Sequence, residues 1–84
     1  MTLPENPVTL TVEQIKELNQ KLSHMRHDIN NHLSLMMAAT ELMRHKPQTA
    51  ERMLEALNDR PKKISETMAA FSVEFEQALS IRRG

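Results

Sequence analysis

Two stretches of the chain repeat hydrophobic residues at alternating spacings of three and four. In the first, placing Ile15 at position a of a seven-residue repeat assigns the other apolar residues to a and d. Such a repeat predicts a helix that packs on other helices through one face. Its members are Ile15, Leu18, Leu22, Met25, Ile29, His32, Met36, Ala39 and Met43. Leu33, Leu35 and Leu42 flank this face and widen it, which favours a bundle helix over a two-stranded coiled coil.

The second stretch lies beyond Pro47 and repeats with the same period. Its members are Ala50, Leu54, Leu57, Ile64, Met68, Phe71, Phe75 and Ala78. Pro61 falls on this face, where it is expected to kink or open the helix near Leu57–Asn58. No part of the chain alternates in the manner of a strand, so we expect an all-helical protein.

The ends of both helices carry recognisable signals. Pro4 and Pro7 predict an extended arm over residues 1–10. Thr11 with Gln14 three residues later matches a capping box, so the first helix is expected over about 12–45. Pro47 suits the first turn of a second helix over about 47–81, and the connection near 44–46 is short. Residues 11–84 therefore predict one antiparallel helical hairpin.

A single hairpin leaves part of its apolar surface in water. Each helix of about 34 residues would be about 50 Å long, and one hairpin buries only the face between its two helices. Two hairpins together bury the flanking faces as well, so we expect an all-α homodimeric four-helix bundle. The expected dimer and bundle core comprises Ile15, Leu18, Leu22, Met25, Ile29, Met36, Met43, Leu57, Ile64, Met68, Phe71 and Phe75.

Composition excludes several classes of function. The 84 residues are enough for one domain, and there is no cysteine for disulfides or thiolate metal sites. Neither a membrane span nor a signal peptide is visible, so a cytoplasmic location is expected. The formal net charge of zero argues against nucleic-acid binding. The sole glycine is Gly84, so the chain has no glycine-rich phosphate loop and is not expected to bind ATP.

His27 is the residue with the most suggestive chemistry. It takes heptad position f, opposite the apolar face, and Asn31 lies one turn further on. An exposed imidazole is a competent nucleophile when one ring nitrogen is held and the other is free. Asp28 is the candidate to hold the ring and act as acid or base. Asn31 is the candidate to bind a phosphoryl oxygen or orient a water molecule, and Arg26 to add positive charge.

Simpler interpretations compete with this one. An exposed histidine on a helix is most often a solvated polar side chain, and His32 in the apolar face is more naturally a core or register-setting residue. His24, His27 and Asp28 share a face and offer metal ligands. One turn of one helix supplies few ligands, so we expect no metal site. The methionines are expected to be flexible core filler.

The stretch His27-Asp28-Ile29-Asn30-Asn31-His32-Leu33 resembles the H-box of sensor histidine kinases of two-component systems. The most similar subgroup has a box that reads His-Asp-aromatic-Asn-Asn-aliphatic-Leu. In that family the box lies on the first helix of the dimerisation and histidine-phosphotransfer (DHp, HisKA-like) domain, a hairpin that pairs into a four-helix bundle. Ala70-Phe71-Ser72 is also similar to a pattern on the family's second helix, so the resemblance covers about residues 12–80.

The resemblance implies roles for individual residues. His27 would be the phosphoacceptor, Asp28 its acid/base partner and Asn31 the polar residue one turn on. Asp28-x-x-Asn31 also looks like the motif with which such proteins dephosphorylate a receiver domain. Two departures are Ile29 in place of an aromatic residue and His32 in place of an apolar residue or proline. Leu35 and Ala38, with Arg26, are the expected contacts for a receiver.

The family's ATP-binding domain has no counterpart in these residues. ATP and magnesium would be bound by a separate kinase domain, so the chain is not expected to autophosphorylate alone. The leading hypothesis is a homodimer in which His27 accepts a phosphoryl group and passes it to a receiver aspartate. A receiver-docking phosphatase module and a non-catalytic dimerisation or adaptor bundle remain the alternatives.

Overall fold

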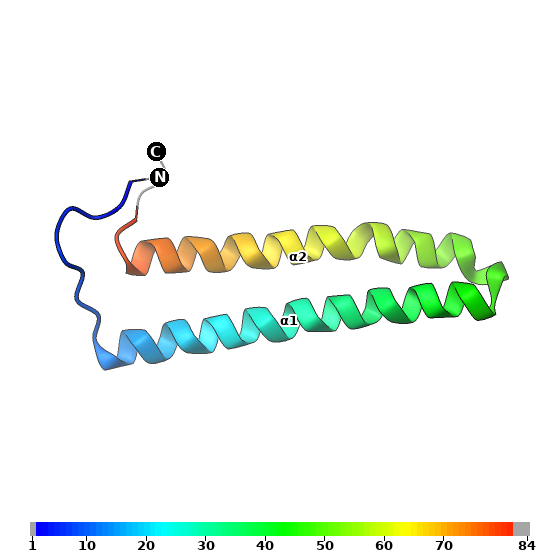
Figure 1. The fold of residues 1–84 in the computed structure, drawn as a ribbon, viewed down its shortest axis with the longest axis horizontal. Helices are drawn as coiled ribbons and strands as arrows, with labels where there is room; N and C mark the ends of the chain where they lie inside the picture. Colours follow the sequence, from blue (N-terminus) through cyan, green and yellow to red (C-terminus); the bar gives the residue numbers. More distant parts are fainter. Residues whose placement is uncertain (1, 82–84) are drawn as a thin grey trace.

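The computed structural model describes residues 2–81 and is a hairpin of two long helices (Figure 1). Helix α1 spans Val12–His45, the 3₁₀ turn η1 spans Pro47–Thr49, and α2 spans Ala50–Ala78. The two helices run antiparallel, and residues 2–10 form an irregular arm beside the open end. The expected helical hairpin is confirmed.

Helix α1 begins with the predicted capping box. The Gln14 backbone N–H donates to Thr11 Oγ1 at 3.1 Å, and the Thr11 N–H donates to Gln14 Oε1 at 2.8 Å. Two N–H groups that the first turn leaves without helical partners are satisfied in this way. The capping-box prediction is therefore confirmed.

The connection between the helices is short because Pro47 starts a new turn almost at once. The Lys46 N–H donates to the Leu42 carbonyl at 2.7 Å, which closes the last turn of α1. Pro47 then opens η1, where its missing N–H costs nothing. The α-helical part of the second helix consequently starts at Ala50, three residues later than the sequence pattern predicts.

Helix α2 continues through Pro61 as an uninterrupted α-helix. It ends in a Schellman motif, in which the Ile81 N–H donates to the Glu76 carbonyl at 2.8 Å and the Ser80 N–H to the Gln77 carbonyl at 3.3 Å. Ser80 has φ of 56°, the left-handed conformation that this motif requires. The α-helix thus stops at Ala78, shortly before the predicted end at 81.

The face of α1 that turns toward α2 follows the predicted repeat from Leu18 onward, whereas Ile15, its first predicted member, remains 53% exposed. The less exposed residues of this face include Leu18, Leu22, Met25, Ile29, His32, Met36 and Met43. Ala39, at the same face, is the one described residue that is buried, with 5% of its surface exposed. A small side chain there allows close approach of the two helices near the turn.

The face of α2 that turns toward α1 differs in part from the predicted one. Leu57, Ile64 and Phe71 are shielded as expected, but they alternate with Met53, Arg60 and Thr67. The predicted members Leu54, Met68 and Phe75 remain 57, 51 and 42% exposed. Two polar positions therefore face the other helix, while a row of large apolar side chains is left beside the contact.

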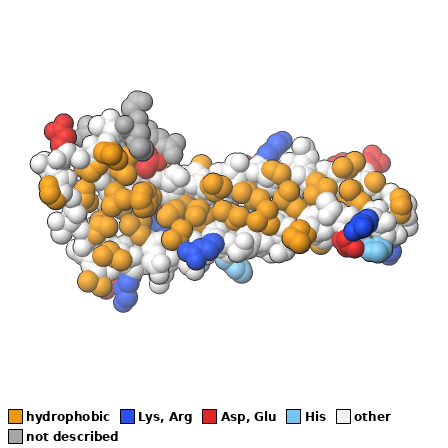
Figure 2. All heavy atoms as spheres, in the orientation of Figure 1, with side chains coloured by type: hydrophobic (Ala, Val, Ile, Leu, Met, Phe, Trp, Pro, Cys, Tyr) orange, Lys and Arg blue, Asp and Glu red, His pale blue; other side chains and the backbone are white. Residues whose placement is uncertain are grey.

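The hairpin is one helix thick. Its principal extents are 58 × 28 × 12 Å, and its radius of gyration of 18.1 Å far exceeds the roughly 12 Å of a compact domain of this length. Figure 2 shows a band of hydrophobic side chains along both helices. Neither α1 nor α2 combines the length and apolar character needed to cross a membrane.

Candidate functional site

His27 lies near the middle of α1 with its side chain exposed. It is on the side predicted by the heptad pattern, away from α2. Among residues 2–81, none of the hydrogen bonds or ion pairs found involves its imidazole. Both ring nitrogens are therefore open to a reactant that approaches from solvent.

Asp28 is exposed beside His27, but it does not hold the ring. No hydrogen bond joins the two side chains in the described part of the chain. The physical reason is helical geometry, since consecutive side chains point about 100° apart at 3.6 residues per turn. Asp28 therefore does not orient the imidazole in this structure, and its expected acid/base role stays a prediction.

One stripe of α1 unites His27 with three other predicted residues. His27, Asn31, Leu35 and Ala38 follow one another at spacings of four, four and three, and all four are exposed. Residues so spaced lie on the same side of a helix. We call these four residues the His27 stripe; it extends along α1 for about 16 Å at 1.5 Å per residue.

Arg26 is exposed but lies off this stripe. It precedes His27 directly, so its side chain leaves the helix about 100° around the axis from the imidazole. His24, one turn before His27, continues the stripe toward the start of α1. No group of three His, Asp or Glu side chains suited to a metal ion occurs among the described residues.

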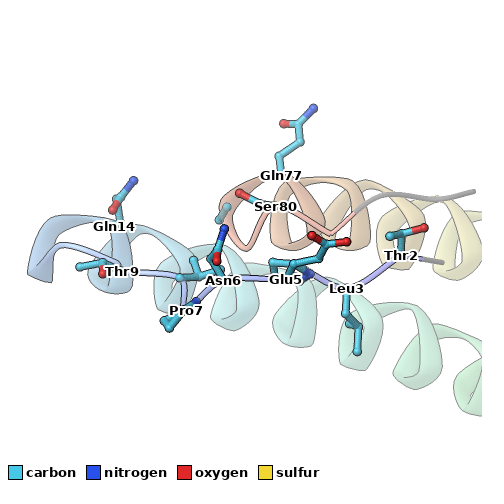
Figure 3. A pocket seen from close by; sticks show the side chains of 12 residues that line it. Thr2, Leu3, Glu5, Asn6, Pro7, Thr9, Gln14, Gln77 and Ser80 are labelled. Atoms are coloured by element: carbon cyan, nitrogen blue, oxygen red, sulfur yellow. The ribbon is translucent and has the colours of Figure 1, made fainter.

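The His27 stripe lies on open helix surface rather than in a cavity. A hollow of about 880 Å³ is present at the open end of the hairpin, where the arm passes beside the end of α2 (Figure 3). Asn6, Gln14, Gln77 and Ser80 are among its lining residues, and His27, Asp28 and Asn31 are not. A surface site of this kind suits a macromolecular partner better than an enclosed small substrate.

Two polar contacts between the helices were missed by the sequence pattern. Lys21 Nζ lies 2.5 Å from Glu74 Oε2, and Arg60 Nη1 lies 3.2 Å from His32 Nδ1. The pattern included His32 but not Arg60 or Glu74, because the apolar residues of α2 alone define another face. The face of α2 that contacts α1 also repeats at spacings of three and four, once polar residues are allowed in the repeat. Its members are Met53, Leu57, Arg60, Ile64, Thr67 and Phe71.

The Lys21–Glu74 contact perturbs one ionisable group. The hydrogen bond to Glu74 raises the pKa of Lys21 above its usual value, partial desolvation opposes this rise, and Glu17 at 3.3 Å adds to it. Both side chains of the cross-helix pair stay partly exposed, at 38% for Lys21 and 48% for Glu74. The contact therefore helps to set which faces of the helices meet, with a modest effect on stability.

Comparisons with family models, with curated proteins and with solved structures found no match to this chain. The assignment of function consequently depends on the residues of the chain and on where the structure places them.

Proposed function

We propose that the chain is a cytoplasmic dimerisation and histidine-phosphotransfer module of two-component signalling. The observation that carries the proposal is the placement of His27. It belongs to a His-Asp-x-Asn-Asn sequence, it is exposed near the middle of the first helix of a hairpin, and its imidazole is unengaged within the described residues. A phosphoacceptor needs an accessible ring nitrogen with a lone pair, and this arrangement supplies it.

The proposed reaction consists of two phosphoryl transfers, one from a donor to His27 and one from His27 to a receiver aspartate. A ring nitrogen of His27 attacks the phosphorus of a donor, which is ATP held by a separate kinase domain or the aspartyl phosphate of a receiver. A P–N bond forms, the P–O bond to the donor's leaving group breaks, and the ring loses its N–H proton to Asp28 or water. In the onward step a receiver aspartate attacks, the P–N bond breaks and the imidazole regains a proton.

The neighbouring residues have distinct parts in this reaction. Asp28 lies beside the reacting ring and serves as the proton acceptor and donor. Asn31, one turn along the His27 stripe, donates its amide N–H to a phosphoryl oxygen. Leu35 and Ala38 extend the stripe as an apolar contact for the receiver, and Arg26 attracts the incoming phosphate from the flank.

Dimerisation through the apolar band is supported by surface area. The chain exposes 6837 Å², whereas a compact protein of its mass exposes about 5,100 Å². If each copy of a pair buried this excess of about 1,700 Å², the interface would total about 3,400 Å², which is typical of obligate homodimers. The exposed Leu54, Met68 and Phe75 supply apolar side chains for it.

The test is the intact mass of the purified protein at neutral pH. It is measured after incubation with phosphoramidate and, separately, with phosphorylated receivers from the same source. We expect an acid-labile gain of one phosphoryl group that is absent in His27→Gln. His24→Gln is the matched control, because His24 is a similarly exposed histidine one turn away on the same helix. No gain from any donor, or an equal gain in His27→Gln, would refute phosphotransfer at His27.

A second candidate function is favoured by the apolar band itself. A hairpin that dimerises and displays the His27 stripe as a docking surface needs no phosphohistidine. It would act as an adaptor, or with Asp28 and Asn31 as a phosphatase that positions water at a receiver's aspartyl phosphate. In the phosphatase, His27→Gln weakens or spares receiver dephosphorylation while Asn31→Ala abolishes it. In the adaptor, neither substitution changes hydrolysis and both leave receiver binding in place.

A further inference from the structure

His32 and Arg60 form a partly buried polar contact between the helices. Arg60 Nη1 lies 3.2 Å from His32 Nδ1, across 28 residues of sequence. A guanidinium carries N–H donors and no acceptor, so the imidazole nitrogen must accept this hydrogen bond. His32 can do so only as the neutral ring with its proton on Nε2. The contact therefore requires one protonation state and one tautomer of His32.

The other charged groups near this contact are all exposed. On α2, Asp59 lies next to Arg60 and Lys63 lies one turn beyond it; on α1, Asp28 lies one turn before His32. Within residues 2–81, no ion pair that we found involves Arg60. The Arg60 guanidinium is thus the charge that directly faces the imidazole, and it is positive.

Pro61 weakens α2 at the same level. Proline has no backbone N–H, so the Leu57 carbonyl, four residues earlier, lacks its usual helical donor. The helix is continuous here, yet one of its hydrogen bonds is missing beside the residue that contacts His32. The polar contact consequently lies where α2 is least secured by its own backbone.

We propose that His32 and Arg60 form a proton-sensitive latch across the hairpin. With neutral His32 the hydrogen bond holds α2 against α1 at Pro61. When His32 takes up a proton, Nδ1 gains a hydrogen and loses its lone pair, and two positive charges meet at hydrogen-bonding distance. Arg60 then leaves the contact for water and the hairpin loosens at this level. The latch does not depend on any reaction at His27.

The direction of the pH effect follows from the geometry of the contact. Arg60 can donate only to an unprotonated Nδ1, so acid removes the acceptor and breaks the hydrogen bond. The contact is therefore expected to stabilise the hairpin at pH 8 and to be weakened in acid. We expect the unfolding equilibrium constant to gain about tenfold between pH 8 and pH 5 from this contact alone, the size expected for one hydrogen bond to a charged donor.

The first experiment measures urea unfolding by circular dichroism at pH 8 and pH 5, at one chain concentration. The informative variant is His32→Asn, whose amide oxygen replaces Nδ1 as acceptor without titrating. We expect the unfolding equilibrium constant to rise about tenfold more in the wild type than in His32→Asn over this pH range. His24→Gln, which removes an exposed histidine outside the contact, should lose as much stability between pH 8 and pH 5 as the wild type does. An equal loss in the wild type and His32→Asn would overturn the proposal.

Two further measurements separate the latch from a general effect of the substitution. Arg60→Met removes the guanidinium and keeps the apolar stem, so it should reduce the pH-dependent loss as His32→Asn does. Nitrogen NMR of the unsubstituted protein at pH 8 should show the neutral His32 ring with its proton on Nε2. An unchanged loss in Arg60→Met, or a proton on Nδ1, would contradict the latch, and the NMR result applies even if a variant fails to fold.

Discussion

Lys21 of α1 and Glu74 of α2 meet across the hairpin, with Nζ 2.5 Å from Oε2, although 53 residues separate them in the sequence. Glu17 approaches the same ammonium group at 3.3 Å. A single cation is therefore shared by a carboxylate of its own helix and one of the opposite helix. Such a pair is satisfied at one relative rotation and register of the helices, so it contributes to specificity more than to stability.

The raised pKa of Lys21 predicts a loss of stability at alkaline pH. The contribution of the pair is fully present below the ordinary lysine pKa of 10.5 and disappears as the pH rises through the higher value in the folded hairpin. We expect Glu74→Gln to be less stable than the wild type at pH 9. As the pH is raised further, the variant should lose less stability than the wild type. Thermal unfolding between pH 9 and pH 12 measures both effects.

A matched control for this pair comes from the same ammonium group. Glu17→Gln removes the longer contact within α1 and keeps the cross-helix one, so its alkaline loss should stay close to that of the wild type. Added salt should shrink the difference between wild type and Glu74→Gln, because the pair is partly exposed and is screened. A Glu74→Gln protein with the wild-type alkaline profile would contradict the role of this contact.

The capping box at the start of α1 predicts a second stability effect. Thr11→Ala removes the oxygen that accepts the Gln14 N–H, so an N–H of the first turn is left to water alone. We expect a loss of about 1 kcal/mol in the free energy of unfolding, measured by urea titration. Thr9→Ala is the control: Thr9 is an exposed threonine of the arm and has no capping role. Equal stability of the two variants would show that the cap contributes nothing.

Local signals predicted the helices well because they act within a few residues. The capping box, Pro47 at the turn and the three-and-four spacing of α1 each depend on neighbours in the chain. Of the kink or opening expected near Leu57–Asn58, the opening does not occur, and a kink stays a prediction. The missing N–H of Pro61 affects a single helical hydrogen bond, and the structure shows α2 as helical on both sides of the proline.

The rotation of α2 was harder to predict because it depends on partners distant in sequence. The predicted repeat through Leu54, Met68 and Phe75 takes only hydrophobic residues into account. It therefore misses two polar contacts with α1, those of Arg60 with His32 and of Glu74 with Lys21. Charged and polar residues on a contact face become acceptable only once their partners are known. The exposure of His27, by contrast, follows from its own helix, so its placement could be predicted from the heptad pattern.

The left-handed residue at the end of α2 predicts a stabilising substitution. Ser80 adopts φ of 56° in the Schellman motif, a conformation that costs an L-residue with a Cβ about 1–2 kcal/mol. Glycine avoids that cost but loses more backbone entropy on folding. We therefore expect Ser80→Gly to raise the free energy of unfolding by about 0.5–1 kcal/mol in a urea titration.

The same substitution inside the helix should have the opposite effect. Ser65 is exposed in the middle of α2, so Ser65→Gly is expected to lower stability by about 0.5 kcal/mol. The contrast between the two serines tests the backbone conformation rather than the loss of a hydroxyl group. A Ser80→Gly protein that is destabilised like Ser65→Gly would contradict the left-handed cap.

The apolar band predicts how the proposed dimer responds to charge. Met68 is 51% exposed in the single hairpin, and in a symmetric pair its substitution occurs twice. Full burial of a methionine is worth about 1.5–3 kcal/mol, and about half of it is left for the dimer at Met68, so loss of this burial in both copies of Met68→Glu should weaken dimerisation by roughly 10- to 10²-fold. Val73→Glu is the matched control on the same helix, because Val73 is 48% exposed but lies outside the repeat of Leu54, Met68 and Phe75. Sedimentation equilibrium at micromolar concentration distinguishes the outcomes. A dimeric wild type, a monomeric Met68→Glu and a dimeric Val73→Glu would support the pair, whereas a monomeric wild type would refute it.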